Sequence, residues 1–315
     1  MFKEIFQRQY CNYLCSLALC VLLSLTANSV IAQNNIASIL GYPADSKLLI
    51  IHADDLGVSH SENMASFEAI EKGLVNSASV MMPTPWVLEV ANYAKKHAKT
   101  HDFGLHLVLS SEWKNYKWGP VSPVNKVPSL IDEHGYFHKG CISDLNMKEV
   151  EAELRAQVDR AYAMGLEPTH LDSHMGCLLG SKKLTEVYLK VGQSYNLPVL
   201  ASKEFPEEFL SKYDVKIVLD EIITIMEDEY SNGPVEYYTN KIRSLKPGLS
   251  TFLIHTAFDD HEMQGITIDH PDWGSEWRQK DFDFFTSETC KNILAEEKII
   301  LVTWRQLREA FYKAP

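Results

Sequence analysis

Short apolar runs alternate along the chain with stretches in which apolar residues recur every three or four positions. Runs rich in β-branched residues are typical of buried strands, and the three-to-four spacing is typical of helices with one buried face. The strands predicted in this way are 47–52, 77–82, 103–109, 169–173, 198–201, 215–219, 251–255 and 299–302. The helices predicted between them are 61–72, 86–97, 147–163, 184–195, 235–245 and 287–296.

Alternation of strands and helices favours an α/β fold with a largely parallel sheet. A set of strands of this size predicts a single (β/α) barrel, TIM-like with some irregular strands, and such barrels place their active sites at the C-terminal ends of the strands. Polar residues stand at these predicted ends on four strands. They are Asp54 and Asp55, His106, Asp172 with His174, and His255.

The segment LLIIHADDLG, residues 48–57, carries two adjacent carboxylates at the end of an apolar run. Burying carboxylates without partners is costly, so something must compensate their charge. One interpretation is that one aspartate binds a metal ion while the other acts as a base. The other is that the pair caps the helix predicted at 61–72, because aspartate commonly caps helices.

Histidines in two further segments support the metal interpretation. His106 lies within the apolar segment GLHLVL, where a lone histidine can equally be a core residue. In THLDSH, His170, Asp172 and His174 share a face if the segment is extended, and the two histidines share one if it is helical. Imidazoles together with a carboxylate suit zinc and other divalent ions, and three protein ligands leave a position open for chemistry.

The first residues are typical of a secretory signal peptide. Lys3 and Arg8 precede an apolar stretch at 11–27, and a small-x-small cleavage motif ends at Ala32. An uncleaved membrane-anchoring helix is the alternative, although the apolar stretch is short for a span. We therefore expect an exported, periplasmic protein without stable membrane association, whose residues 33–315 form one domain of a length typical of one barrel.

Charge and cysteine content exclude some other classes. The formal net charge is −12, and no clustered basic stripe is present, which argues against a nucleic-acid partner. Cys141, Cys177 and Cys290 remain after the leader, an odd number without CxxC spacing. We expect neither a disulfide framework nor a zinc knuckle, and we expect Cys177 to be an inert buried thiol.

Five segments in order resemble the YdjC-like family, also called the ChbG/HpnK family, of carbohydrate deacetylases. They are HADDLGVSHSEN, GLVNSASVMM, GLHLVL, VPSLIDEHGYF and PTHLDSH, between about Lys47 and His174, with weaker similarity at LIHTAFDD and LVTWRQL. The resemblance implies a (β/α) barrel that hydrolyses the acetamido group of N-acetylated mono- or oligosaccharides.

The same resemblance implies roles for individual residues. Asp55, His106 and His174 would bind one divalent metal ion, zinc or magnesium, and Asp54 would be the catalytic base. His255 matches a late family histidine and would act as general acid or as stabiliser of the oxyanion.

The sequence also departs from the family pattern. Met175, Gly176 and Cys177 follow HLDSH where relatives often continue with further histidines, HTA at 255–257 replaces HPG, and Leu200 replaces an arginine. Two alternatives therefore remain, an exported metal-dependent hydrolase of another amide or ester bond, and a glycan-binding protein that has lost catalysis.

Two aromatic loops could border the site. They contain Trp113, Tyr116 and Trp118 in one, and Trp273, Trp277 and Arg278 in the other. Aromatic rings on such loops can stack against sugars, or they can pack against their own loops.

Overall fold

The structure of the protein is a computed structural model that describes residues 35–312, so the expected signal peptide at 1–32 lies outside the described residues. Its strands form one parallel sheet in the order β4-β3-β2-β1-β6-β5, and β7 also pairs with β1. The strands are β1 Lys47–Leu56, β2 Ser77–Val80, β3 Phe103–Leu107, β4 Leu171–Ser173, β5 Glu221–Ile223, β6 Gly248–Ile254 and β7 Ile300–Leu301.

Two isolated bridges curl this row of strands toward closure. Leu171 in β4 bridges to Val199, and Ser202 bridges to Leu219, which lies just before β5. The segments predicted as strands at 198–201 and 215–219 are thus reduced to single bridges, while β5 was not predicted. Pro198 contributes to this irregularity because it has no N–H to donate to a ladder. The α/β barrel-like fold is as expected, with irregular strands on one side.

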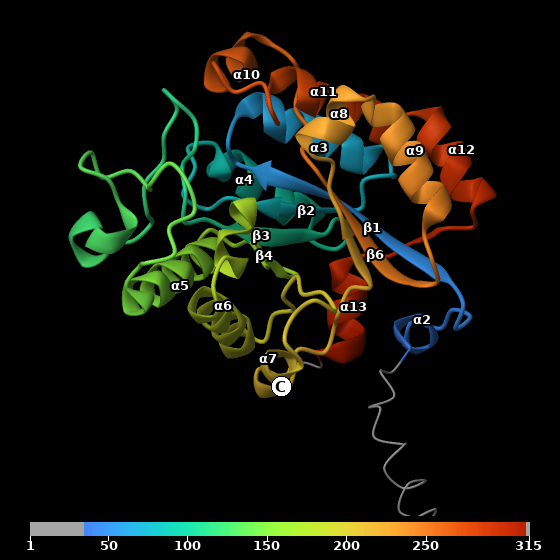
Figure 1. Cartoon of the computed structure of the whole chain (residues 1–315), viewed down its shortest axis with the longest axis horizontal. Coiled ribbons are helices and arrows are strands. Elements are labelled where there is room, and N and C mark those ends of the chain that lie inside the picture. The colour runs from blue at the N-terminus through green and yellow to red at the C-terminus, as the bar shows by residue number, and fades with distance from the viewer. Residues whose placement is uncertain (1–34, 313–315) are drawn as a thin grey trace, which may run out of the picture.

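Helices surround the sheet (Figure 1). They are α2 Ile36–Ile39, α3 His60–Glu71, α4 Val87–His97, α5 Met147–Ala163, α6 Lys182–Tyr195, α7 Glu207–Lys212, α8 Glu227–Ser231, α9 Pro234–Ser244, α10 His261–Ile266, α11 Ser275–Phe285, α12 Glu288–Glu296 and α13 Trp304–Phe311, with 3-10 turns η1 Val124–Lys126, η2 Pro128–Leu130 and η3 His174–Leu179. In Figure 1, α5 packs beside α6 and α9 beside α12, on opposite sides of the sheet. Among residues 35–312, no helix is both long and apolar enough to cross a membrane.

The helices form where the sequence provides a buried stripe and a cap. In α5, the buried residues Val150, Leu154, Val158 and Ala161 recur every three or four positions and face the core. The side chain of Asn146 accepts a hydrogen bond from the backbone N–H of Lys148 and so caps the start of α5.

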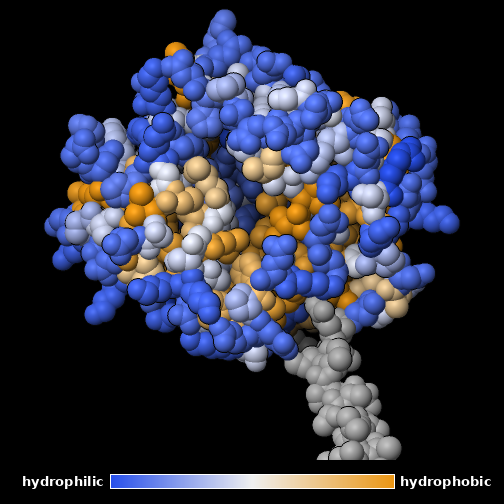
Figure 2. Space-filling model, viewed as in Figure 1, coloured by the Kyte–Doolittle hydropathy of each residue, from blue (hydrophilic) through white to orange (hydrophobic). Residues whose placement is uncertain are grey.

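β1 lies at the centre of the sheet and is buried along nearly its whole length. Because it has neighbours on both edges and helices cover the sheet, its apolar residues do not alternate with polar ones. The surface is hollowed near the end of β1 in the same view (Figure 2). The C-terminal ends of the parallel strands therefore open toward a recess.

Candidate metal centre and active site

The polar residues predicted at the strand ends, except Asp172, line one pocket of about 420 Å³. Asp54 and Asp55 lie near the end of β1, His106 lies in β3, His174 follows β4 and His255 follows β6. Parallel strands bring their carboxyl ends to one rim, which is why residues far apart in sequence meet here.

Asp54 and Asp55 both reach this pocket although neighbouring residues in a regular strand point to opposite faces. The pairing of β1 with β2 shifts register between Ala53 and Leu56, and Asp55 has a left-handed φ of 67°. Such a bulge redirects side chains next to active sites. The pair does not cap α3, because the side chain of Ser59 is the cap.

The side chains of Asp55, His106 and His174 form a compact buried group, with one donor atom of each within 4.8 Å of the others. Oδ1 of Asp55 lies 3.3 Å from Nε2 of His106 and 3.1 Å from Nδ1 of His174. Two ligands bound to one zinc ion at about 2.1 Å are roughly 3 to 3.5 Å apart in tetrahedral geometry. The spacing of these atoms therefore fits a divalent ion between them.

Each of the two histidines has a carboxylate on its other ring nitrogen. Nδ1 of His106 is 2.6 Å from Oδ1 of Asp172, and Nε2 of His174 is 3.0 Å from Oε2 of Glu112. A carboxylate behind a histidine fixes the ring and the tautomer, which leaves the lone pair on the facing nitrogen for a metal. Asp172 and Glu112 therefore prepare both imidazoles for ligation.

The charges of the group also fit a cation. Burial by itself lowers the pKa of His174, but Glu112 and Asp55 outweigh burial and raise that pKa to about 9. Burial likewise opposes the charged form of His106, whereas Asp172 and Asp54 raise its pKa well above the ordinary value. The carboxylates thus hold positive charge at these two rings, and a divalent ion supplies positive charge at the same place.

Asp55 has a further partner in Arg278 of α11. Nη2 of Arg278 donates to Oδ2 of Asp55 at 2.8 Å, and Nη1 donates to Oε2 of Glu62 at 2.9 Å. Burial alone would raise the pKa of Asp55, but Arg278 and then His174 lower it well below the usual range. The guanidinium also lies over the ring of Trp113, 5.4 Å from its centroid. Arg278 therefore keeps Asp55 ionised and fixes its outer oxygen.

Asp54 contacts a different histidine, His52 of β1. Oδ1 of Asp54 is 3.0 Å from Nε2 of His52, and the hydroxyl of Ser79 donates to the same oxygen at 3.3 Å. Burial alone would lower the pKa of His52, but Asp172 and Asp54 raise it to about 9. The buried imidazole of His52 thus holds Asp54 in place, while the carboxylate of Asp54 borders the pocket.

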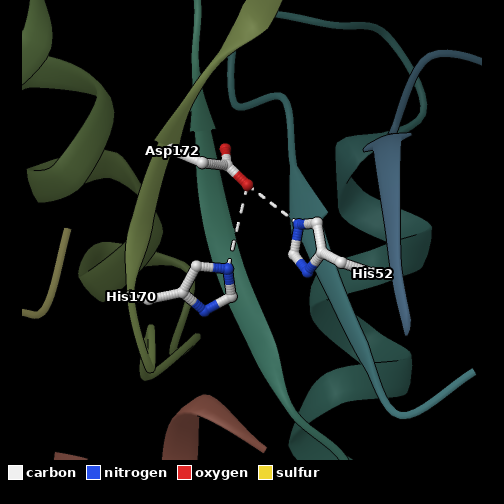
Figure 3. Close-up of side chains that lie close together, drawn as sticks. All are labelled: His52, His170 and Asp172. Atoms are coloured by element: carbon white, nitrogen blue, oxygen red, sulfur yellow. Dashed lines mark hydrogen bonds and ion pairs between the residues drawn. The ribbon is translucent and has the colours of Figure 1, made fainter. Parts of the chain in front are cut away.

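His170 lies beside Asp172 and His52 (Figure 3). It is fully buried and does not line the pocket. Its Nε2 is 3.8 Å from Oδ2 of Asp172, which is beyond a hydrogen bond, and its ring stacks on Trp304. The ring fills the space beside Gly104, where a Cβ atom would come within 2.3 Å of it. In THLDSH, only His174 therefore belongs to the group around Asp55.

His255 lies on the pocket wall next to Asp55. Its Nε2 is 3.9 Å from Oδ2 of Asp55, and its backbone N–H donates to Asp281 at 3.0 Å. Burial lowers the pKa of His255 to about 4. The side chain is one of the more exposed in the group, at 18%, so a bound molecule can reach it.

The aromatic residues of the two loops were expected either to stack against sugars or to pack against their own loops, and both kinds of position occur. Trp113 and Trp273 line the pocket, but Trp113 is as buried as Trp118 and Trp277, which pack within the protein. Tyr116 donates its hydroxyl to the carbonyl of Val58. Of these four tryptophans, Trp273 is therefore the one whose ring a substrate in the pocket can meet.

The expectation for the cysteines was wrong. Cys141 and Cys177 form a disulfide across 36 residues of sequence. Cys177 lies in η3, directly after β4, and the loop that carries Cys141 folds over that end of the strand. The pairing could not be predicted from the sequence, because the two cysteines are far apart along the chain and only the fold brings their thiols together. Cys290 is a buried free thiol.

Three residues that hold the side chains of this site in place were not predicted from the sequence. Glu112 and His52 were not named as site residues, and Arg278 was considered only as part of an aromatic loop. The acidic residue in SSEW and the histidine in HADD are visible in the sequence, but nothing in their spacing indicates which side chain each will contact.

Comparisons with known proteins identify the family of this chain. The sequence pattern of the YdjC-like protein family matches residues 48–296. A protein of Thermus thermophilus named carbohydrate deacetylase is 32% identical, with 84% of this chain and 96% of the relative aligned. A protein of Serratia marcescens named chitooligosaccharide deacetylase is also 32% identical, with 83% of this chain and 99% of the relative aligned.

A solved structure from Enterococcus faecalis, described as a putative cellobiose-phosphate cleavage protein, superimposes with a TM-score of 0.72. It is 27% identical, and the match covers 83% of this chain and 99% of the other. The family match spans most of the chain, including all five residues predicted for the site. This chain is a member of the YdjC-like protein family.

Proposed function

We propose that this protein is a metal-dependent carbohydrate deacetylase that hydrolyses the acetamido group of N-acetylated sugars or oligosaccharides. The observation that carries the proposal is the group of Asp55, His106 and His174 with Asp54 beside it in one pocket. Two relatives that align over most of this chain are named as deacetylases of carbohydrates.

Asp55, His106 and His174 are the residues that would hold the ion. Of zinc and magnesium, zinc suits two imidazole nitrogens and one carboxylate better, because magnesium prefers oxygen ligands. When bound, the ion would supply Lewis-acid polarisation of the acetyl carbonyl. Asp172 and Glu112 would keep the two histidines in the ligating tautomer.

The remaining steps are assigned to Asp54 and His255. Asp54 takes a proton from the attacking water as the oxygen bonds to the carbonyl carbon. The protonated Asp54 then donates this proton to the leaving nitrogen as the C–N bond breaks, so that the amine departs together with acetic acid, which ionises to acetate. His255 lies beside the ligand Asp55, so we assign its ring N–H to the carbonyl oxygen as that atom gains negative charge, rather than to the leaving amine.

Export is part of the proposal. The predicted signal peptide at 1–32 and the disulfide between Cys141 and Cys177 both support an oxidising compartment, the periplasm.

The test is acetate release from a panel of N-acetylated mono- and oligosaccharides. Protein stripped with a chelator and reloaded with zinc or magnesium is compared with the stripped protein, and bound metal is counted in parallel. We expect one ion per chain and acetate release that returns with the metal. If one ion binds but no sugar releases acetate, the reaction is wrong, and acetate esters and other amides become the next panel. Glycan binding without any hydrolysis would indicate a binding protein.

A further inference from the structure

We propose that His52 is a positioning residue that joins the base Asp54 to the ligand His106 through Asp172. The inference rests on the proposed function, because it uses the roles assigned there to Asp54 and His106. Neither His52 nor Asp172 reaches the reacting atoms. Their effect on the reaction would pass through the side chains that they hold.

The connection runs through three short contacts. Nδ1 of His106 lies 2.6 Å from Oδ1 of Asp172, and Nε2 of His52 lies 2.8 Å from Oδ2 of the same carboxylate. The same Nε2 lies 3.0 Å from Oδ1 of Asp54. Figure 3 shows the carboxylate of Asp172 pointing toward His52. One imidazole edge therefore meets two carboxylates, one behind the metal ligand and one at the pocket.

The sheet fixes the ring of His52. His52 pairs in register with Ser77 of β2, and the hydroxyl of Ser77 is 2.8 Å from Nδ1 of the ring. The hydroxyl of Ser79 is 3.0 Å from Nε2, the nitrogen that also contacts Asp172 and Asp54. The side chain of His52 is fully buried, so water cannot replace these partners. Because adjacent strands hold the ring of His52 at both nitrogens, the ring can keep the carboxylate of Asp54 in one position.

The short contact between His52 and Asp172 is explained by a hydrogen bond through a shared proton, rather than by a second metal ion. His52, His170 and Asp172 could in principle form a metal site, because their donor atoms lie within 4.8 Å of one another. However, His52 and Asp172 are 2.8 Å apart and His170 and Asp172 are 3.8 Å apart. Ligands of one zinc ion are about 3.4 Å apart in tetrahedral geometry, and 2.8 Å is the distance of a charge-assisted hydrogen bond.

This arrangement explains why the carboxylates of Asp54 and Asp172 can both be buried close to one another. Two carboxylates with no positive group between them repel each other and lose their hydration. The imidazole of His52 offsets both charges, so neither side chain must turn away toward solvent. Without that ring, Asp54 would move from the position in which it meets the attacking water, and His106 would lose the carboxylate that orients it.

Two substitutions at His52 separate positioning from packing. His52→Gln places an amide nitrogen near the position of Nε2, whereas His52→Leu fills space without a donor. For H52L we expect kcat to fall on the order of 100-fold with KM nearly unchanged, because a displaced base affects the reaction and not binding. We expect zinc affinity to fall about tenfold, as is typical when a residue behind a ligand is lost. H52Q should recover part of both, because its amide restores a hydrogen-bond donor but not the positive charge.

The matched control is His170→Leu. His170 is an equally buried histidine of the same cluster, but it makes no hydrogen bond to either carboxylate. H170L should lower thermal stability and leave kcat and zinc affinity close to those of the wild type. If H52L does not fold, Asp172→Asn replaces it, because that variant keeps the shape and removes an acceptor from His106 or His52. Equal losses of kcat in H52L and H170L would overturn the proposal.

A double-mutant cycle tests whether His52 acts through Asp54. If it does, H52L adds little to the loss of kcat already caused by Asp54→Asn, since the base is absent in both. Additive losses would overturn this connection.

Zinc affinity and the nitrogen-15 signals of the His52 ring are measured without substrate, so they do not depend on the proposed reaction. A wild type that binds zinc but releases no acetate contradicts the proposed function, whereas unchanged zinc affinity and ring signals in D172N contradict the positioning role.

Discussion

Arg278 donates a hydrogen bond of 2.8 Å to Oδ2 of Asp55, although the two residues are separated by 223 positions in the sequence. The same guanidinium donates to Glu62 at 2.9 Å, and all three side chains are buried. The guanidinium of Arg278 therefore donates hydrogen bonds to two buried carboxyl groups, and one of them, Asp55, is a proposed metal ligand. Arg278 joins α11 to β1 and α3 at the rim of the barrel.

Replacing Arg278 with Met should destabilise the protein strongly. The substitution removes the guanidinium that pairs with both Asp55 and Glu62, and the loss of one partner from a buried ion pair typically costs about 3 to 5 kcal/mol. Urea unfolding of metal-free protein measures the change. The double variant R278M/E62Q should recover part of the loss because glutamine at position 62 cannot become a buried unpaired carboxylate. Wild-type stability in R278M would show that the ion pairs are not needed for folding.

Glu62 should make stability depend on pH. Burial raises the pKa of Glu62 to about 8 from an ordinary value of 4.5, even though Arg278 opposes the rise. The folded protein therefore holds this proton more tightly than the unfolded chain does, so its contribution is fully present below pH 4.5 and is lost as pH rises toward 8. Unfolding free energies at pH 5 and pH 8 should differ less in Glu62→Gln than in the wild type. An identical difference in both proteins would exclude Glu62 as a source.

Replacing Asp54 with Asn should remove turnover and spare the metal. Asn keeps the shape of the side chain but cannot take a proton from water, and loss of a general base typically lowers kcat by about 10² to 10⁴. Bound zinc, counted by elemental analysis, should stay at the wild-type level. Asp55→Asn is the neighbouring control and should lose zinc. Loss of zinc in D54N would exchange the roles assigned to the two aspartates.

The role of His255 can be read from two substrates. An N-acetyl sugar has a poor amine leaving group, whereas 4-nitrophenyl acetate needs no proton on its leaving group. If His255 stabilises the carbonyl oxygen, His255→Ala should slow both reactions by about 10² to 10³. His255→Gln should retain part of the activity because it keeps an N–H donor. A loss confined to the amide would assign His255 to the leaving amine instead.

The disulfide between Cys141 and Cys177 should stabilise the protein by constraining the unfolded chain. For 36 residues of separation, the chain-entropy relation gives about 3 to 4 kcal/mol. Cys141→Ser should lower the unfolding free energy by about that amount. A reductant should lower the wild type to the level of the double variant C141S/C177S, which itself should not respond. A response of the double variant would point to Cys290.

Periodicity was enough to predict most elements of the fold. The helix at 147–163 agrees with α5 at both ends, and the strand at 47 begins β1, because long amphipathic stretches and continuous buried runs leave few alternatives. The short segments at 198–201 and 215–219 were less predictable. Whether a few apolar residues form a strand or one bridge depends on the neighbours that tertiary packing supplies.

The sequence by itself determined which residue types reach the rim: the aspartate pair, His106, His174 and His255 follow strands whose ends must meet in a parallel barrel. Only the tertiary structure decided that Asp54 and Asp55 face the same pocket, since a bulge and a left-handed backbone at Asp55 reverse the alternation of the strand. It also decided the partners: Arg278 on Asp55, Glu112 behind His174, Asp172 behind His106, and Cys141 on Cys177. Local spacing determines the direction of a side chain within an element, whereas its contacts across the fold depend on how distant elements pack.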